Sequence, residues 1–306
     1  MKIKLGERKV LAKVIAAASV MGLASSSAWS QDDAGFALEE VVVTAQKREQ
    51  NLQQVPVSIT SYSALELEQK AINSVVDLEK SSPNTQFRAS RATNSTLTAY
   101  IRGVGQQDPL WGFEPGVGVY VDDVYYARPQ AAAMDVFDVE RIEVLRGPQG
   151  TLYGSGSLAG TVRYIMNKPE MTETYGSVSA NYGVTEGSQG FNLTTDAMIN
   201  LPISDKLAVR ANIGEIDNDG IVDYANVYKL DNDNPIPDGG DLLTDIAEFE
   251  RVEDADTVDI SYARVSVLFE PSDTFSAQLS YQQQEDKIGG RRQTTTGKNG
   301  FGESYG

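Results

Sequence analysis

The sequence predicts a compact α+β domain over residues 55–169, followed by an antiparallel β-sheet of the membrane-barrel type from residue 170 onward. Helix caps and short strands alternate with turn residues in the first region, which has a normal size for one domain. The second region instead alternates between apolar and polar residues. Long and short connections alternate between its strands. This is the layout of an outer-membrane barrel, which has short periplasmic turns and long external loops.

The composition of the chain narrows the possible functions. Its 306 residues include neither cysteine nor histidine, which excludes disulfides, zinc sites with Cys or His ligands, thiol nucleophiles and histidine-assisted catalysis. The formal net charge of −17 repels nucleic acid, because binding depends on neutralising phosphates. Carboxylates and lysines are the groups left for chemistry. We predict no enzyme, no catalytic residues, no cofactor, no metal site and no nucleic-acid partner.

The first thirty residues have the pattern of a cleaved secretory signal peptide. Basic residues between Lys2 and Lys13 precede an apolar run over residues 14–24, which is too short to span a bilayer. The small residues of Ala28-Trp-Ser30 predict cleavage before Gln31. A buried N-terminal helix is the alternative. The predicted mature chain is therefore exported to a bacterial envelope.

Residues 31–54 are predicted to be a flexible segment that holds one β-strand. The strand lies in Leu38-Glu-Glu-Val-Val-Val-Thr-Ala45, where three valines and a threonine favour an extended backbone. Because polar residues flank this stretch, no partner strand is expected nearby in the sequence. Such a strand suits pairing with the sheet edge of another protein. It is equally typical of the first strand of the following domain, and the pattern leaves both options open.

Within residues 55–169 the pattern predicts two helices and several strands. Ser61 or Ser63 can cap a helix over residues 64–71, and Ser74 can cap a second helix over residues 75–80. Asp122-Asp123 is predicted to be the turn of a β-hairpin. The predicted strands cover residues 97–102, 116–121, 124–127, 141–145 and 161–166.

A glycine-rich run over residues 139–162 raises the question of a nucleotide site. Gly154, Gly156 and Ala159 fit only the permissive form of the dinucleotide fingerprint, which requires a helix directly after the loop. The residues Thr161-Val-Arg-Tyr-Ile165 have the pattern of a strand instead. No Gly-Lys-Ser/Thr closes a P-loop. We therefore interpret these glycines as turn residues at the end of a strand.

Five alternating strands are predicted after residue 170, each apolar on one side and polar on the other. The alternating segments are 177–182, 191–201, 207–213, 264–269 and 275–282. A soluble β-sandwich is the alternative, although it does not require the alternation of loop lengths. The shorter connections are 202–205 and 271–273, and the longer ones are 184–190 and 217–256.

Acidic residues concentrate in residues 217–256, which we predict to be a long external loop. Asp217-Asn-Asp-Gly220 suggests a calcium loop, but the twelfth position would be Asn226 instead of a glutamate, so the EF-hand spacing fails. A solvated loop is the preferred interpretation. The neighbouring carboxylates Glu39-Glu40 and Asp122-Asp123 are not expected to converge on a substrate, because they lie in extended chain and at a hairpin tip.

Four stretches of the chain resemble the TonB-dependent outer-membrane receptors. They are Glu39-Glu-Val-Val-Val-Thr-Ala45, Ile101-Arg-Gly-Val-Gly105, Gly118-Val-Tyr-Val-Asp-Asp-Val-Tyr125 and the run from Val139 to Pro169. Together they cover residues 39–169 with high specificity, and the later strands resemble the same family's barrel more weakly. The resemblance implies an α+β plug domain followed by an incomplete antiparallel transmembrane β-barrel. About five strands are present, whereas the family's barrels have about 22.

The resemblance also implies a mechanism with several partners. An external small-molecule ligand, such as an iron-siderophore complex, cobalamin or a carbohydrate, crosses the outer membrane through a barrel surrounded by lipid. The inner-membrane energising complex acts through the periplasmic domain of TonB, which binds the TonB box. The box residues are Glu39, Glu40, Val41, Val42, Val43, Thr44 and Ala45.

Two arginines match plug residues of the family that pair with barrel carboxylates. They are Arg102 and Arg146, each at the end of a predicted strand. Bidentate pairs between such arginines and carboxylates would hold the plug closed. Strand-end charges that face water are the alternative.

Other interpretations stay open on the sequence alone. A stand-alone periplasmic plug-like protein would bind TonB or a ligand without a barrel, and a broken gene would leave a non-functional remnant. An envelope hydrolase that uses carboxylates is a third class. Because natural barrels need about eight strands or more, five strands cannot close one, and we expect a fragment or a remnant of a longer receptor.

Overall fold

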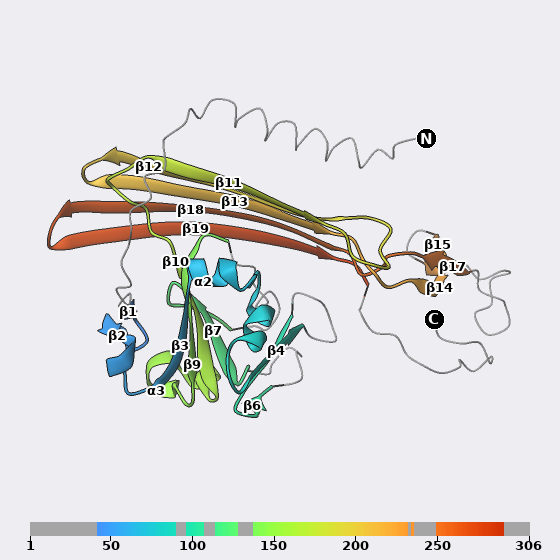
Figure 1. The fold of residues 1–306 in the computed structure, drawn as a ribbon, viewed down its shortest axis with the longest axis horizontal. Coiled ribbons are helices and arrows are strands. Elements are labelled where there is room, and N and C mark those ends of the chain that lie inside the picture. Colours follow the sequence, from blue (N-terminus) through green and yellow to red (C-terminus); the bar gives the residue numbers. More distant parts are fainter. Residues whose placement is uncertain are drawn as a thin grey trace. The chain divides into compact units, whose positions relative to one another are not determined.

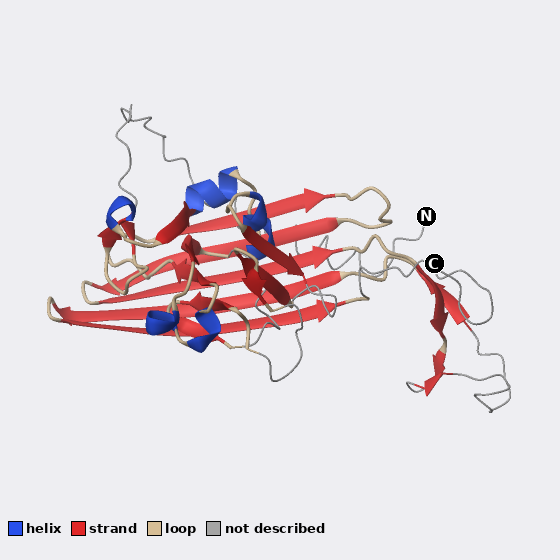
Figure 2. Cartoon of the chain, turned by 90° about the horizontal axis from the view of Figure 1, so that it is seen from below, coloured by secondary structure: helices blue, strands red, loops and turns tan. Residues whose placement is uncertain are grey.

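The computed structural model describes residues 42–89, 96–106, 114–127, 137–231, 234–235 and 249–290. The predicted signal peptide, residues 1–30, lies outside the described residues. Short helices and strands are followed by long strands (Figure 1), and strands predominate throughout (Figure 2). Among the helices of the described ranges, none is both long enough and apolar enough to cross a membrane.

A small antiparallel ribbon comes first in the described chain. Its strands are β1 (Val42–Val43) and β2 (Gln50–Asn51), and a 3-10 turn, η1 (Leu52–Gln54), follows. Val42 pairs with Asn51, and Val43 pairs with Gln50. The expectation that this strand has no partner nearby in the sequence was therefore wrong. The polar run between the strands folds back as a turn, in which the amide of Lys47 donates to the carbonyl of Thr44 at 2.9 Å.

The α+β domain is built on a five-stranded mixed sheet of order β3-β9-β10-β7-β8. Strand β10 runs parallel to β7 and antiparallel to β9. The strands are β3 (Ser58–Ser63), β9 (Val139–Arg146), β10 (Gly160–Met166), β7 (Val117–Val121) and β8 (Val124–Tyr126). A smaller sheet joins β4 (Thr85–Ala89), β5 (Leu97–Ile101) and β6 (Val104–Gly105).

The helices of this domain are short, and the first two begin at predicted caps. Ser63 and Glu66 form a capping box on α2 (Ala64–Gln69), which ends two residues before the predicted boundary. Ser74 caps a 3-10 helix, η2 (Val75–Lys80), where we predicted an α-helix. The remaining helices are α3 (Gly150–Tyr153) and η3 (Ser155–Ser157).

One apolar core joins both sheets and the first two helices. Tyr62, Phe87, Ile142 and Tyr164 are among its fully buried members. Ile142 and Tyr164 face this core from β9 and β10. Since side chains alternate along a strand, the neighbouring residues on β9 and β10 project from the opposite face of the sheet. That second face carries the candidate site.

The predicted hairpin at Asp122-Asp123 is confirmed. It joins β7 to β8, and Val121 pairs directly with Val124. Asp122 has φ 44° and Asp123 has φ 69°. Positive φ at both central residues is the requirement of a type I′ hairpin turn, and aspartate tolerates it better than most residues.

The second region is a sheet of five long antiparallel strands, which confirms the five predicted strands. Its order is β11-β12-β13-β18-β19, so each strand pairs with its neighbours in the chain apart from the insertion between β13 and β18. The strands are β11 (Tyr175–Gly183), β12 (Asn192–Ser204), β13 (Leu207–Asn218), β18 (Val258–Ser272) and β19 (Phe275–Ile288). Among the described residues this sheet does not close, because β11 and β19 each have one neighbour.

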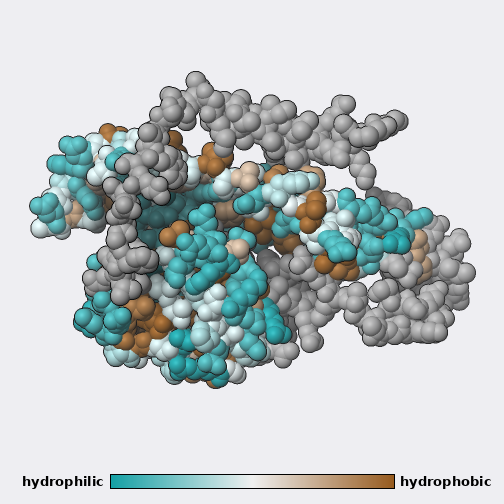
Figure 3. Space-filling view, viewed as in Figure 1, coloured by the Kyte–Doolittle hydropathy of each residue, from teal (hydrophilic) through white to brown (hydrophobic). Residues whose placement is uncertain are grey.

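The two faces of this sheet have opposite chemistry. One row across the strands, in register, consists of Ile199, Ala211, Val265 and Tyr281. On that face large apolar side chains are exposed; 61 % of Ile213 and 75 % of Leu279 are accessible. The space-filling view accordingly has apolar residues at the surface of the described chain (Figure 3). A soluble sandwich would bury such a face, whereas a lipid-facing sheet exposes it.

The other face carries many polar side chains, and part of it is buried. Its neighbouring row consists of Asn200, Arg210, Ser266 and Ser280. Asn200, Arg210 and Ser266 are buried. This inverted pattern is that of a barrel wall with a polar lumen face.

The long connection between β13 and β18 begins later than predicted and contains short antiparallel strand pairs. Asp217 already belongs to β13. Beyond it, β14 (Tyr224–Tyr228) pairs with β17 (Phe249–Val252), and β15 (Leu230–Asp231) pairs with β16 (Asn234–Pro235). Residues 236–248 lie outside the described part of the chain.

Candidate functional site

The end of the valine strand is bound by one buried carboxylate. The amide of Thr44 donates to Oε1 of Glu143 at 2.9 Å. Glu143 lies in the middle of β9 and is fully buried. A backbone donor aimed at a carboxylate forms a charge-assisted hydrogen bond, which is stronger than a neutral one.

Two arginines neutralise that carboxylate. Arg163 donates to Oε2 of Glu143 at 2.6 Å, and Arg141 donates to Oε1 at 3.0 Å. Both guanidinium groups also reach the hydroxyl of Thr44, at 3.0 Å from Arg163 and 3.1 Å from Arg141. A buried charge is tolerated only when it is paired and hydrogen-bonded, so Glu143 and its arginines form one interdependent group.

Apolar burial and an aromatic group hold the same segment. Val43 is fully buried, and Ala45 is 1 % exposed. The phenol of Tyr153 donates to the carbonyl of Ala45 at 2.7 Å. Burial raises the pKa of Tyr153 to about 12, so the phenol stays protonated and able to donate at physiological pH. Tyr120 packs edge-on against Tyr153 and donates to its carbonyl.

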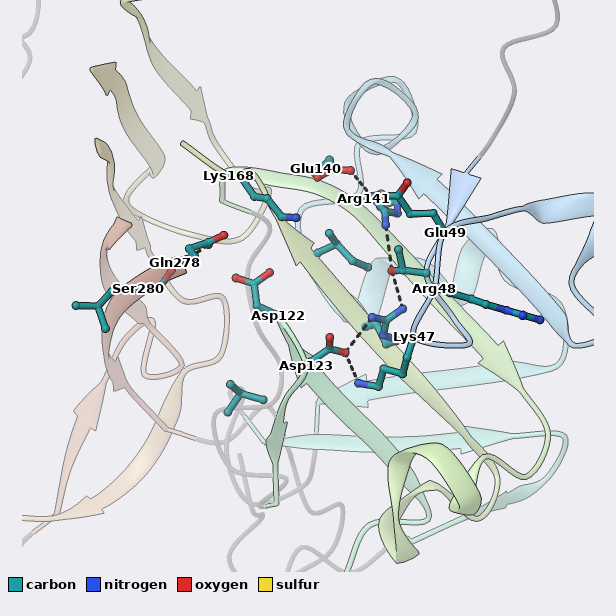
Figure 4. A pocket seen from close by; sticks show the side chains of 15 residues that line it. Lys47, Arg48, Glu49, Asp122, Asp123, Glu140, Arg141, Lys168, Gln278 and Ser280 are labelled. Carbon is teal, nitrogen blue, oxygen red and sulfur yellow. Dashed lines mark hydrogen bonds and ion pairs between the residues drawn. The ribbon is translucent and has the colours of Figure 1, made fainter. Parts of the chain in front are cut away.

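A further ion pair lies just beyond the strand. Lys47 pairs with Asp123 of the hairpin turn, and Arg163 donates to the same carboxylate oxygen at 3.0 Å (Figure 4). Burial alone would raise the pKa of Asp123, but the hydrogen bond from Lys47 and the charge of Arg163 outweigh it and lower that pKa. We call these contacts of residues 42–47 with Asp123, Glu143, Tyr153 and Arg163 the N-terminal latch.

Two further ion pairs join the α+β domain to the long sheet. Asp138 receives a bidentate pair from Arg210 of β13, at 2.8 Å from Nε and 2.6 Å from the second nitrogen. Asp122 receives Arg264 of β18 at 2.5 Å. Phe137, beside Asp138, stacks on Tyr262 and lies against Gly214, where an added Cβ would be 2.8 Å from the phenyl ring.

A cavity of about 950 Å³ lies beside the latch (Figure 4). Charges of both signs line it, among them Lys47, Arg48, Asp123 and Lys168. Part of its lining comes from β19, through Gln278 and Ser280. In the described part of the chain no group of three or more acidic side chains is placed to hold a metal ion.

Residues 51–161 match the family described as the TonB-dependent receptor plug domain. This part of the chain is therefore a plug domain of the TonB-dependent receptor family. The homologues that share it are outer-membrane receptors, which indicates a location in the outer membrane of a Gram-negative cell.

Curated relatives in sequence are receptors and transporters. The chain is 31 % identical over 164 residues to the vitamin B12 transporter BtuB of Vibrio vulnificus (strain CMCP6). The matched region covers 51 % of this chain and 25 % of the relative. It is 30 % identical over 199 residues to the iron-regulated outer membrane virulence protein of Vibrio cholerae. Here the matched region covers 61 % of this chain and 28 % of the relative. The chain therefore spans roughly a quarter of the length of these relatives.

Solved structures of the family share the fold. The ferripyoverdine receptor of Pseudomonas aeruginosa matches with a TM-score of 0.59 and 16 % identity, over 92 % of this chain and 32 % of the receptor. The ferric-catecholate import receptor Fiu of E. coli matches with a TM-score of 0.54 and 16 % identity, over 81 % of this chain and 28 % of the receptor. A plug followed by barrel strands is the fold that both matches support.

The predicted TonB box is only partly described. Glu39, Glu40 and Val41 lie outside the described residues. The remaining box residues, 42–45, form β1 and the start of the latch, and the latch buries Val43 and Ala45. Residues 43–45 are therefore bound to the plug domain.

The predicted plug arginines contact other residues of the α+β domain. Arg146 donates to the carbonyl of Pro83 at 3.3 Å. The amide of Arg102 donates to the carbonyl of Asn84 at 2.8 Å, and a nitrogen of its guanidinium lies near Gly147. Neither guanidinium forms an ion pair with any residue that the structure describes. Their role in closing the plug stays a prediction.

The residues that bind the predicted box were not among the predicted site residues. Glu143 and Arg163 lie within predicted strands, and they pair directly across β9 and β10. The available signal was a charged residue in the middle of each strand, flanked by residues of a buried core. The plug-to-sheet pairs also have the reverse polarity of the expected ones, with aspartates on the plug and arginines on the sheet.

The glycine-rich run reverses the chain after β9 as predicted, but it contains two short helices that were not predicted, α3 from Gly150 and η3 around Gly156. Strand β10 returns antiparallel to β9, whereas a dinucleotide site requires a strand, a crossover helix and a parallel strand. Gly154 has φ 81°, which favours glycine. A Cβ on Gly156 would collide with the hydroxyl of Tyr125, so close approach demands glycine there.

Proposed function

We propose that the chain takes part in TonB-dependent active uptake of a scarce ligand across the outer membrane. In this proposal the box residues Glu39, Glu40, Val41, Val42, Val43, Thr44 and Ala45 bind the periplasmic domain of TonB. The observation that supports it most directly is the latch, because it binds this segment through contacts that one strand can leave without unfolding the plug core.

The pairing of the box with its own chain is small. Strand β1 has two residues, and only Val42 and Val43 are in register with β2. Two-stranded ribbons of this kind are marginal in water. A longer strand of a partner can replace β2 and gain more main-chain hydrogen bonds, which is the physics of strand addition.

Force applied to the box would act on the plug through a short path. Thr44 is bound to Glu143 in β9, and Arg163 extends the contact to β10. Both strands are central in the plug sheet. Pulling on the paired strand therefore loads the middle of the plug, which is where a path through a surrounding barrel would have to open.

The ligand class follows from the family. The relatives are named as a vitamin B12 transporter and a receptor bound to ferripyoverdine. We therefore infer that the external ligand is an iron-siderophore complex or a cobalamin, with a carbohydrate as a third class. In this role the protein transports and does not catalyse, with lipid around the sheet and TonB as its periplasmic partner.

A proline in the box tests the proposal. The chain has no cysteine, so Glu40→Cys supplies a single site for thiol crosslinking to the periplasmic domain of TonB. In that background Val42→Pro removes a main-chain donor and fixes φ, and we expect the crosslink yield to fall by at least about tenfold. Val42→Thr, which keeps the donor and the strand propensity, is the matched control. An unchanged yield with Val42→Pro would reject TonB binding by strand addition.

A further inference from the structure

We propose that the Asp122-Asp123 turn couples strand β18 of the barrel sheet to the N-terminal latch, so that loss of the Arg264–Asp122 pair loosens the box. The inference rests on the proposed function, because it assigns a control of box release. It depends on two adjacent carboxylates that point in opposite directions. Figure 4 shows Asp123 toward Lys47, and Asp122 toward the side of Gln278 and Ser280.

Asp122 is the side of the turn that binds the sheet. Its Oδ2 receives Arg264 at 2.5 Å, and its Oδ1 accepts the amide of Met166 at 3.0 Å. Arg264 is 4 % exposed in its side chain, and Asp122 is its ion-pair partner among the described residues. The Nη1 atom of Arg264 is buried and has no hydrogen-bond partner there. The guanidinium of Arg264 thus has one unused donor. A new acceptor could bind this donor and so pull the guanidinium away from Asp122.

Asp123 is the side of the turn that binds the latch. It pairs with Lys47 and, at 3.0 Å, with Arg163. Arg163 in turn binds both Glu143 and the hydroxyl of Thr44. Only one residue, Asp123, therefore separates the group that holds Thr44 from the residue that binds the sheet.

The backbone of the turn makes the two sides dependent on each other. Both aspartates have positive φ, a conformation that L-residues adopt only when surrounding contacts hold it. They are the two central residues of a two-residue turn, so rotation at Asp122 changes the direction of Asp123. When Arg264 leaves, the turn loses one of the bonds that fix this conformation, and Asp123 shifts relative to Lys47 and Arg163.

The Arg210–Asp138 pair also joins the plug to the sheet, but it is not connected to the latch. Arg210 binds Asp138, whose other contacts are the side chain and amide of Asn167. Within the described residues, no hydrogen bond or ion pair of Asp138 leads to the latch. A general loosening of the plug from the sheet is therefore separable from the coupling through Asp122-Asp123.

The test measures exposure of the buried box residue Ala45 in membranes that contain the full chain. Ala45→Cys is the only thiol of the chain, and its rate of modification by a maleimide reports opening of the latch. Ala99→Cys, in the plug core, reports general loosening. Arg264→Gln should speed modification at residue 45 by at least about fivefold, the lower end of ordinary coupling between sites, and leave residue 99 unchanged.

Asp123→Asn should have the same effect from the other side of the turn, and the double variant should be no faster than Asp123→Asn alone. Asp122→Asn tests the same link if Arg264→Gln fails to assemble, because asparagine also tolerates positive φ. A parental rate at residue 45 in Arg264→Gln and Asp122→Asn overturns the proposal, as does an equal rise at residues 45 and 99. The assay contains no TonB, so its outcome is independent of whether the box binds TonB.

Discussion

At the scale of single residues, Asp123 holds the latch through charge. Lys47 and Arg163 face its carboxylate from the N-terminal ribbon and from β10. Their effect on the pKa exceeds that of burial, so the carboxylate stays ionised below its ordinary pKa of 3.8. A lowered pKa in the folded state means that the contribution is present above the ordinary value and is lost as the pH falls through the folded value.

The lowered pKa of Asp123 predicts how the latch depends on pH. A spin label at Arg48→Cys, an exposed position next to the latch, should keep the same mobility from about pH 8 to about pH 5, because Asp123 is ionised over that range. Its mobility should rise only below pH 3.8. In Asp123→Asn the mobility is expected to be raised already at neutral pH. A transition near neutral pH in the parental chain, absent from Asp123→Asn, would contradict the assignment.

At the scale of elements, strands β11, β12, β13, β18 and β19 follow from the sequence because apolar and polar residues alternate along most of their length. Period-two alternation is a local pattern and needs no knowledge of the partner strand. The latch has no such local pattern, since Thr44 lies 99 residues before Glu143 and 119 before Arg163. The hairpin at Asp122-Asp123 was predictable as a turn. Its two roles were not, because they depend on residues from other elements.

The joint between β13 and the plug gives a prediction at the same scale. Arg210 and Asp138 are 5 % and 7 % exposed in their side chains. Asp138→Asn leaves Arg210 buried without a counter-charge, while asparagine still tolerates the φ of 50°. We expect a loss of about 3 kcal/mol in the free energy of unfolding of the plug.

The measurement is a urea titration in membranes, with the reactivity of Ala99→Cys as the unfolding probe. Asp205→Asn, in the exposed turn between β12 and β13, is the matched control. Equal midpoints for Asp138→Asn and Asp205→Asn would show that this ion pair does not hold the plug.

At the scale of the whole molecule, the described chain has two kinds of packing. The plug buries its apolar residues in the ordinary way, whereas the long sheet exposes large apolar residues on one face and buries polar residues on the other. The second arrangement is stable only where the surroundings of the exposed face are themselves apolar. This distinguishes a membrane wall from a stand-alone periplasmic protein more directly than the strand pattern does.

A charge on the outer face tests that distinction. Ile213→Lys places an ammonium at an exposed apolar position of β13, and we expect about 2–4 kcal/mol of destabilisation if that position lies near the bilayer midplane. Recovery of the chain in the outer-membrane fraction should fall. Val104→Lys, at an exposed apolar position of the plug, is the control and should be recovered like the parental chain. Equal recovery of both variants would argue against lipid contact at β13.

The central claim is that the latch withholds the segment that TonB binds. Its most direct test is the crosslink yield between Glu40→Cys and the periplasmic domain of TonB at subsaturating TonB, with and without Glu143→Gln. Glutamine keeps the size of the side chain but loses the charge that binds the Thr44 amide and both arginines. A larger released fraction raises apparent affinity in proportion, so the account predicts a yield roughly tenfold higher in Glu143→Gln. A yield equal to or below that of the parental chain would contradict it.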